Sequence, residues 1–160
     1  MGTALLSFEN KSADRRRARI INFRGNVMTI HADSSDTAGQ FAMLELEGST
    51  GGEPPLHVHR NEDEFFLVLE GRLKVLRGTE ELMLEAGDSA FLPRNIAHTF
   101  KIVSKRARFL NCITPAGFEQ FFRDLGQAAG PDGVLREPGK PFSTEEMIRL
   151  AGLYACTLMP

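Results

Sequence analysis

The sequence predicts an all-β domain, an antiparallel sandwich or barrel, followed by a short helical tail. Three observations lead to this fold class. Polar and apolar residues alternate with period two through the first two-thirds of the 160-residue chain, which is the pattern of half-buried strands. Gly and Pro interrupt the pattern at short intervals, and nothing suggests parallel βαβ units. In the last third, the apolar spacing changes to that of an amphipathic helix.

The alternation is clearest in three stretches, residues 40–48 (QFAMLELEG), 71–78 (GRLKVLRG) and 97–104 (AHTFKIVS). In the first, Leu44 and Leu46 lie on one face of the predicted strand. The glutamates between and after them lie on the other. Each stretch is bounded by Gly, Pro or polar residues, so we expect many short strands joined by tight turns.

The tail is predicted to contain two helices. Phe118, Phe121, Phe122 and Leu125 follow the i, i+3, i+4, i+7 spacing of an apolar helix face. We expect this stripe to pack against the barrel rather than to contact a cofactor. A connector rich in Pro and Gly, residues 131–141, precedes a second helix. Its start is marked by Ser143 and, three residues later, Glu146, the signature of a capping box.

Composition places the chain among ordinary globular proteins. Hydrophobic residues make up 42% and charged residues 25%, and the formal net charge is −2, which gives no electrostatic reason to expect a nucleic-acid partner. No apolar run approaches the roughly 18 residues of a membrane span, and no secretory signal is apparent. Cys112 and Cys156 do not make a disulfide framework. We therefore expect one domain, reduced cysteines and a cytoplasmic location, without nucleic-acid or membrane partners.

Two of the four histidines, His57 and His59, stand one residue apart. On a strand, residues i and i+2 share a face, so both imidazoles point the same way. The polar stretch 60–63 (RNED) can turn the next strand back antiparallel and bring Glu64 beside the pair. His98 heads another alternating strand after a turn centred on Pro93. Each histidine alone would more often be structural, but three imidazoles and one carboxylate together favour a metal such as Fe, Mn, Co, Ni, Cu or Zn.

The spacing of these residues resembles both conserved motifs of the cupin superfamily. The first segment runs from Gly51 through His57, His59 and Glu64 to Gly71, and fifteen residues later the second runs from Gly87 through Pro93 and Asn95 to His98. The resemblance implies a cupin double-stranded β-helix, a jelly-roll barrel, over residues 25–115. Residues 1–24 would then be an N-terminal arm or strands, and residues 116–160 helices that pack on the barrel within the same domain. More loosely, the chain looks like the small single-domain, quercetin-dioxygenase-like cupins.

The second motif departs from the family pattern at two positions. Asn95 stands where the family usually has Gly, but Asn tolerates a positive φ, so we expect the turn to survive. Ile102 stands where the family often has Asn. It shares the predicted inward face of His98 and would replace a polar pocket group by an apolar one. Neither change touches a ligand position.

The resemblance implies that His57, His59, Glu64 and His98 bind one divalent transition metal inside the barrel. In quercetinase-like enzymes the glutamate is thought also to accept a proton from a substrate hydroxyl, which would make Glu64 a catalytic base. Glu62 and Asp63, which flank it, are expected to be solvated turn residues. His31 lies far from both motifs and is expected not to be a ligand. We expect four inward residues to form an apolar substrate pocket: Phe66, Phe91, Phe100 and Ile102.

The function that this resemblance favours is a metal-dependent dioxygenase acting on a small hydroxylated or enolic, possibly aromatic, compound. Two alternatives stay open: a cupin that binds a metal and a small ligand without catalysis, and an isomerase or lyase that uses the same metal without redox chemistry. The predicted outer face with Phe65, Leu67 and Leu69 is apolar. Either the helical tail or a second copy of the chain could cover it, and we expect a homodimer.

Overall fold

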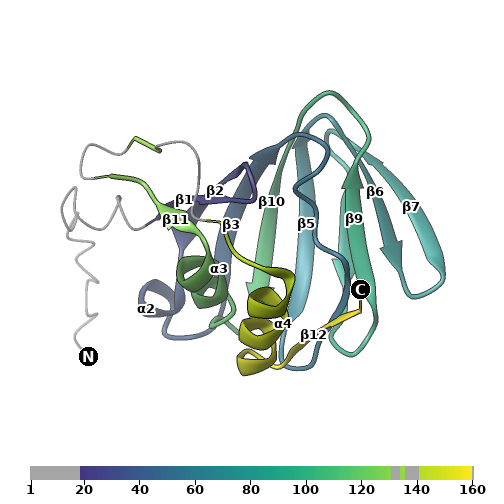
Figure 1. Ribbon diagram of the computed structural model, residues 1–160. Helices are drawn as coiled ribbons and strands as arrows, with labels where there is room; N and C mark the ends of the chain where they lie inside the picture. The colour runs from purple at the N-terminus through teal and green to yellow at the C-terminus, as the bar shows by residue number, and fades with distance from the viewer. Residues whose placement is uncertain (1–18, 131–133, 136–140, 160) are drawn as a thin grey trace, which may run out of the picture.

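The strands of the protein form two antiparallel sheets that face each other (Figure 1). The computed structural model describes residues 19–130, 134–135 and 141–159. One sheet has seven strands in the order β11-β1-β2-β3-β10-β5-β8, and the other has five in the order β12-β4-β9-β6-β7. The strands are β1 Ile20–Phe23, β2 Asn26–Ala32, β3 Ala42–Gly48, β4 Leu56–His59, β5 Asp63–Glu70, β6 Arg72–Arg77, β7 Glu80–Glu85, β8 Ser89–Leu92, β9 His98–Ile102, β10 Ala107–Thr114, β11 Gln127–Ala128 and β12 Cys156–Met159. The helices are α2 Ser34–Thr37, α3 Glu119–Leu125 and α4 Thr144–Leu153.

Two apolar clusters fill the space between the sheets and under the helices. One joins strands β5 to β10 around Phe66, Phe100 and Phe109. The other joins β1, β2 and β3 to the two tail helices, through residues such as Phe121 and Met147. The predicted all-β fold with a helical tail is confirmed, and the tail completes the core at one end of the barrel.

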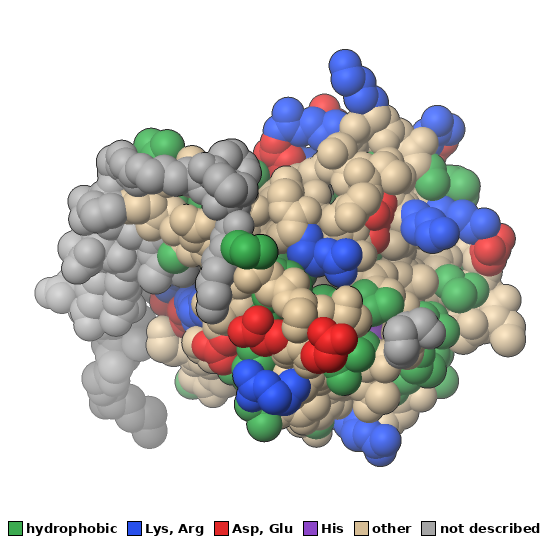
Figure 2. All heavy atoms as spheres, in the orientation of Figure 1, with side chains coloured by type: hydrophobic (Ala, Val, Ile, Leu, Met, Phe, Trp, Pro, Cys, Tyr) green, Lys and Arg blue, Asp and Glu red, His purple; other side chains and the backbone are tan. Residues whose placement is uncertain are grey.

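Both tail helices form where the sequence predicts them. In α3, Phe121 and Leu125 are buried, as the apolar stripe requires. At the start of α4, the Ser143 hydroxyl accepts a hydrogen bond from the Glu146 backbone N–H at 3.1 Å, which satisfies one of the free donors of the first turn. Acidic side chains gather over α4 on the face shown in Figure 2. Glu146 belongs to the first turn of this helix, where negative charge is favourable.

The tail also contributes strands, which the sequence did not predict. After α4 the chain returns as β12 and pairs with β4, so that Leu158 lies opposite His57. Before the connector, β11 pairs with β1. The segment 116–160 is therefore not only helical: β12 becomes an edge of the five-stranded sheet (Figure 1).

The turn at residues 60–63, expected to reverse the chain, and the turn centred on Pro93 do not join neighbouring strands of one sheet. β4 and β5 belong to different sheets, and so do β8 and β9. The turns at residues 60–62 and 93–97 carry the chain across the barrel instead of reversing it within one sheet. Asn95 adopts a φ of 64° in the second of these turns, so the prediction that Asn replaces Gly at a left-handed position is confirmed.

The outer face of β5 is left uncovered by the tail. Phe65 is 42% exposed, and its register partner on β8, Phe91, is 48% exposed. The tail helices pack on the opposite end of the seven-stranded sheet, near β1 and β2. Of the two predicted covers for this face, the described part of the helical tail is therefore not the one that covers Phe65. Within the described ranges, no helix is long and apolar enough to cross a membrane.

Candidate metal site and pocket

The structure brings His57, His59, Glu64 and His98 together between the two sheets. His57 and His59 come from β4, and His98 comes from β9, where it is the register partner of His57. Glu64 reaches the same point from β5 in the opposite sheet. All four side chains are buried, and one donor atom from each lies within 4.8 Å of the others. The crossing turns thus bring together the four residues that the sequence analysis grouped.

Backbone carbonyls fix the orientation of two of the imidazoles. His57 Nδ1 donates to the Pro55 carbonyl at 2.9 Å, and His98 Nδ1 donates to the Ile96 carbonyl at the same distance. A carbonyl oxygen can only accept, so Nδ1 carries the hydrogen in both rings. Nε2 is then the nitrogen that each ring turns towards the cluster. This arrangement is typical of histidines that bind a metal.

Glu64 presents one oxygen to the histidines and is held through the other. Its Oε2 lies 2.8 Å from His98 Nε2 and 3.7 Å from His59 Nε2. Its Oε1 accepts a hydrogen bond from Asn111 Nδ2 at 2.6 Å. Sequence reasoning missed Asn111, although a signal existed. It is the one polar residue among the inward positions 107, 109, 111 and 113 of β10.

The electrostatics of the cluster favour an ionised Glu64. Burial alone would raise the pKa of this carboxyl, but His59 and the hydrogen bond with His98 outweigh it and hold the pKa below its usual range. Burial and the neighbouring His98 lower the pKa of His57 to about 4. Burial also opposes protonation of His98, yet its hydrogen bond with Glu64 raises the His98 pKa. These shifts favour an ion pair between Glu64 and His98 beside a neutral His57.

His59 has three neighbours that the sequence did not assign to the site. Its Nδ1 lies 3.4 Å from Glu62 Oε2, its Nε2 lies 4.0 Å from Cys156 Sγ, and its ring meets the edge of Phe118 with centroids 4.3 Å apart. The expectation that Glu62 is solvated is wrong, because Glu62 is only 6% exposed. Burial raises the pKa of the Cys156 thiol to about 12, so this sulfur stays protonated at neutral pH.

Two other sequence predictions concern charged residues near or outside the site. Asp63 is half-buried and forms an ion pair with Arg94 at 2.8 Å, so it holds the second crossing turn rather than standing free in solvent. His31 lies outside the cluster, where its Nε2 is 2.9 Å from a carboxylate oxygen of Glu45. Its predicted exclusion from the cluster is confirmed.

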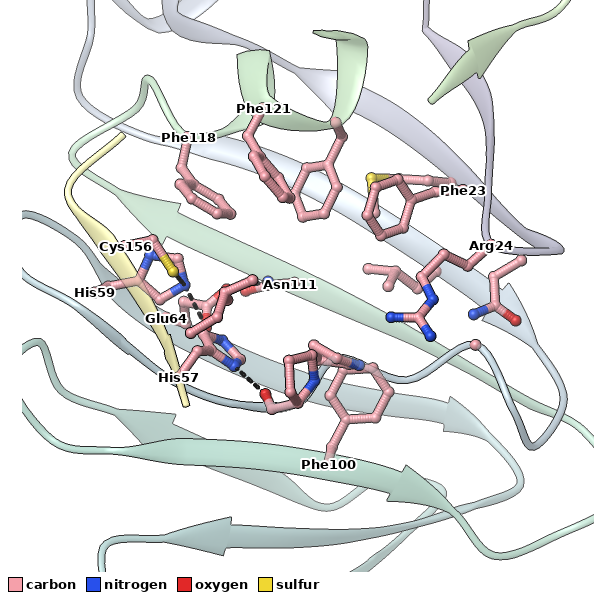
Figure 3. Close-up of a pocket in the computed structure, with 18 of the residues that line it drawn as sticks. Phe23, Arg24, His57, His59, Glu64, Phe100, Asn111, Phe118, Phe121 and Cys156 are labelled. Carbon is pink, nitrogen blue, oxygen red and sulfur yellow. Dashed lines mark hydrogen bonds and ion pairs between the residues drawn. The ribbon is translucent and has the colours of Figure 1, made fainter. Parts of the chain in front are cut away.

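Three residues of the cluster, His57, His59 and Glu64, line a cavity of about 70 Å³, the inner cavity (Figure 3). The rest of its wall is mainly apolar. Phe66, Phe100 and Phe109 of the barrel contact one another with ring centroids 5.0 to 5.7 Å apart. The tail adds Phe118 and Phe121 from its first helical segment. The aromatic stripe, expected only to pack, therefore also closes the inner cavity.

The structure places the four predicted pocket residues in three different environments. Phe66 and Phe100 are buried and line the inner cavity. Ile102 points inward as predicted but is enclosed in the apolar cluster and does not line the cavity. The prediction for Phe91 is wrong: burial along β8 alternates, with Ala90 and Leu92 inside and Phe91 outside. Alternation fixes which residues share a face, but it does not say which face is inner.

A second cavity of about 520 Å³, the outer cavity, adjoins the first. Six residues line both cavities: Arg24, Pro54, Pro55, Phe100, Met147 and Leu158. The outer cavity also contacts α4 through Thr144 and Ile148. It thus lies next to the inner cavity on the side of the tail.

Comparison with known proteins gives results for the sequence and for the fold. Residues 45–113 match the family model described as Cupin domain. Over 97 residues, 61% of this chain, the sequence is 33% identical to the quercetin 2,3-dioxygenase of Bacillus subtilis, and over 78 residues it is 35% identical to that of Aspergillus japonicus. The matched regions are 29% and 22% of those proteins. This chain therefore spans less than a third of the length of these curated relatives.

Two solved structures show the same fold. An RmlC-like cupin from Shewanella frigidimarina superposes with a TM-score of 0.58 and 20% identity, over 70% of this chain and 96% of that one. A predicted oxalate decarboxylase from Thermotoga maritima gives a TM-score of 0.53 and 21% identity, over 61% of this chain and 90% of that one. At these identities the likeness concerns the fold alone.

Proposed function

We propose, from the premise that this chain is a small cupin-domain protein with quercetin-dioxygenase relatives, that it is a metal-dependent enzyme of the dioxygenase type. Its substrate would be a small hydroxylated or enolic compound. The observation that carries the proposal is the buried group of three imidazoles and one carboxylate beside an apolar cavity. Such a donor set suits Fe, Mn, Co, Ni, Cu or Zn.

The residues fit a single divalent ion. Two donors on opposite sides of an ion, each about 2.1 Å away, are about 4.2 Å apart, close to the 4.8 Å within which the four donor atoms lie. The Nε2 atoms of His57 and His98 are the available ones, because Nδ1 of each ring is engaged by a carbonyl. Four protein ligands leave positions free for substrate on an ion that accepts six.

The chain's own groups would then prepare the substrate. A divalent ion at this place supplies Lewis acidity and, if it is redox-active, a path for electrons to dioxygen. Glu64 Oε2 is the base in the proposal: it faces the histidines and can take the hydroxyl proton of the substrate. Asn111 keeps the other oxygen engaged, so that the carboxylate cannot rotate freely. The rings of Phe66, Phe100 and Phe109 exclude water from the resulting anion.

The size of the inner cavity favours a small substrate. Sites for drug-sized ligands have volumes of roughly 300 Å³ or more, whereas the inner cavity has about 70 Å³. A compound larger than a few heavy atoms must therefore extend into the outer cavity, past Phe100 and Met147. A substrate with a narrow reactive end satisfies this geometry better than a broad polycyclic one.

The test combines metal content with oxygen uptake. The wild-type protein and the His57→Ala, His98→Ala and His31→Ala variants are purified without added metal and analysed for bound elements. We expect about one divalent ion per chain in the wild type, the same in His31→Ala, and a loss in the other two. His31 is the matched control because it is the histidine outside the cluster.

Oxygen uptake by the loaded protein is then measured with small enols, hydroxy ketones and catechols. Consumption that depends on the metal and disappears in Glu64→Gln supports a dioxygenase. Conversion of a compound without oxygen uptake would indicate a lyase or an isomerase instead of a dioxygenase. Failure of the wild type to take up Fe, Mn, Co, Ni, Cu or Zn would overturn it.

A further inference from the structure

The boundary between the inner and outer cavities carries two polar groups that the metal cluster does not use. Arg24 lines both cavities, and Asn26 lines the inner one. Arg24 is the first residue of the two-residue turn between β1 and β2, and Asn26, the register partner of Phe23, follows that turn. Figure 3 shows the Arg24 guanidinium projecting towards the space that the His57 and Glu64 side chains face from the other end.

The turn itself directs Arg24 over the cavity. Arg24 has a φ of 54° and Gly25 a φ of 81°, as in the type I′ turns that join hairpin strands. The first position of such turns usually holds Asn, Asp or Gly, because longer side chains disfavour a positive φ. An arginine at this position therefore costs some backbone strain. What it adds over Asn, Asp or Gly is a long, positively charged side chain.

The guanidinium has no anionic partner among the described residues. Its one recorded contact is with Met147 Sδ, at 3.8 Å. Glu53 lines the outer cavity nearby, but its two carboxylate oxygens accept hydrogen bonds from the backbone N–H groups of Gly51 and Ile102, at 2.7 and 3.0 Å. Lys101, which also lines the outer cavity, adds a second positive charge to the approach.

Asn26 is the second observation. Its side chain is only 8% exposed, and no hydrogen bond joins its carboxamide to any residue in the described part of the chain. Two glycines make room for it. A Cβ at Gly48 would lie 1.9 Å from Asn26 Oδ1, and a Cβ at Gly52 would lie 2.1 Å from Asn26 Nδ2. The fold thus holds a nearly buried polar amide beside the cavity. Its two polar atoms are not among the described side-chain atoms that are shut off from solvent without a partner, so they remain open to a ligand.

We propose that Arg24 and Asn26 form a carboxylate-binding subsite at the boundary of the two cavities. Guanidinium groups bind carboxylates through paired hydrogen bonds, and an amide N–H₂ adds a further donor. The substrate would then be a small hydroxy or enolic acid. Its carboxylate would lie at Arg24, its carbon skeleton along Phe100 and Met147, and its oxygen-bearing end at the His57 cluster. This last orientation rests on the proposed function, whereas the subsite itself does not.

The test measures binding to metal-free protein, so that it does not depend on catalysis. Isothermal titration compares 3-(4-hydroxyphenyl)propanoate with its amide, a pair matched in shape and different in charge. We expect the acid to bind about tenfold more tightly or better, the gain of one charge-assisted hydrogen bond. Arg24→Gln should remove the preference for the acid. Arg72→Gln, which removes one exposed positive charge on β6, should keep it.

A second variant controls for misfolding and for a general effect of charge on binding. Asn26→Leu keeps the volume of the side chain and should weaken binding of the acid more than binding of the amide, with an unchanged circular dichroism spectrum. Equal affinity for acid and amide in the wild type, binding of neither, or a preserved preference in Arg24→Gln overturns the subsite. If the preference is present but the protein binds no metal, the subsite stands and the proposed dioxygenase function fails.

Discussion

The hydrogen bond from Asn111 to Glu64 gives the sharpest test of how the candidate site is held. Asn111→Leu keeps the side-chain volume and removes the donor that lies 2.6 Å from Glu64 Oε1. Asn111 Oδ1 is itself buried without a partner, so its loss costs nothing. A hydrogen bond to a charged group contributes about 1.5–3 kcal/mol, which corresponds to about 10- to 150-fold in an equilibrium constant. Loss of a group that orients a ligand typically weakens metal binding by about 10- to 100-fold, so the two values agree.

The assay is competition with a chromogenic chelator, using Co²⁺ or Ni²⁺ and metal-free protein. We expect Asn111→Leu to bind the ion about 10- to 100-fold more weakly than the wild type and to retain the fold. Cys112→Ser is the matched control: it changes the next residue of β10, on the opposite face of the strand, and should leave affinity unchanged. Wild-type affinity in Asn111→Leu would show that the carboxylate needs no orientation from β10, and the reasoning would be refuted.

Three further predictions concern the ion pair in the cluster, the uncovered face and the first helix. Although burial opposes it, the hydrogen bond with Glu64 raises the pKa of His98. Metal must therefore displace a proton, and titrations in two buffers of different ionisation enthalpy should show proton release and weaker binding at pH 6 than at pH 8. The Phe65 and Phe91 pair on the outer face should bury itself in a homodimer. Sedimentation should show dimer for the wild type and monomer for Phe65→Lys, and monomer for both would dismiss the interface. Asp33 caps α2, and despite burial its hydrogen bonds from Ser35 and Arg123 hold its pKa well below the usual range. Asp33→Ala should lower the free energy of unfolding by about 1–2 kcal/mol at pH 7. That difference should shrink as the pH falls below the unfolded carboxyl pKa of about 4, because the stabilisation is lost towards the lower folded-state pKa.

The fold class could be predicted because alternation and turn residues are local signals. Strands β3, β6 and β9 lie where period two places them, and Asn95 adopts the left-handed backbone that its place in the motif requires. The crossing of the chain between sheets could not be predicted in this way. A polar turn such as residues 60–62 has the same composition whether it reverses a strand or carries it across the barrel, since the choice depends on which distant strands pair.

The metal-site residues could be predicted because their spacing is a motif, but their supporting groups could not. Asn111 and Cys156 approach the cluster from β10 and β12, through pairings between segments far apart in the sequence. Phe91 shows the limit of alternation on a short strand: with four residues in β8, an error of one position exchanges the inner and outer faces. Only the pairing register of β8 with β5 shows which face of β8 points into the barrel.

The metal cluster and much of the cavity wall come from different parts of the chain. Ten of the 21 residues that line the inner cavity lie outside the segment 45–113 that matches the cupin family model. All four residues of the metal cluster lie inside that segment, whereas Arg24, Asn26, Phe118 and Met147 come from the flanking hairpin and the tail. The family match therefore accounts for the donor set, but the shape and charge of the approach depend on residues that the match does not include. Two cupins can share the cluster and still accept different molecules, because strands and helices added around the barrel decide what reaches it.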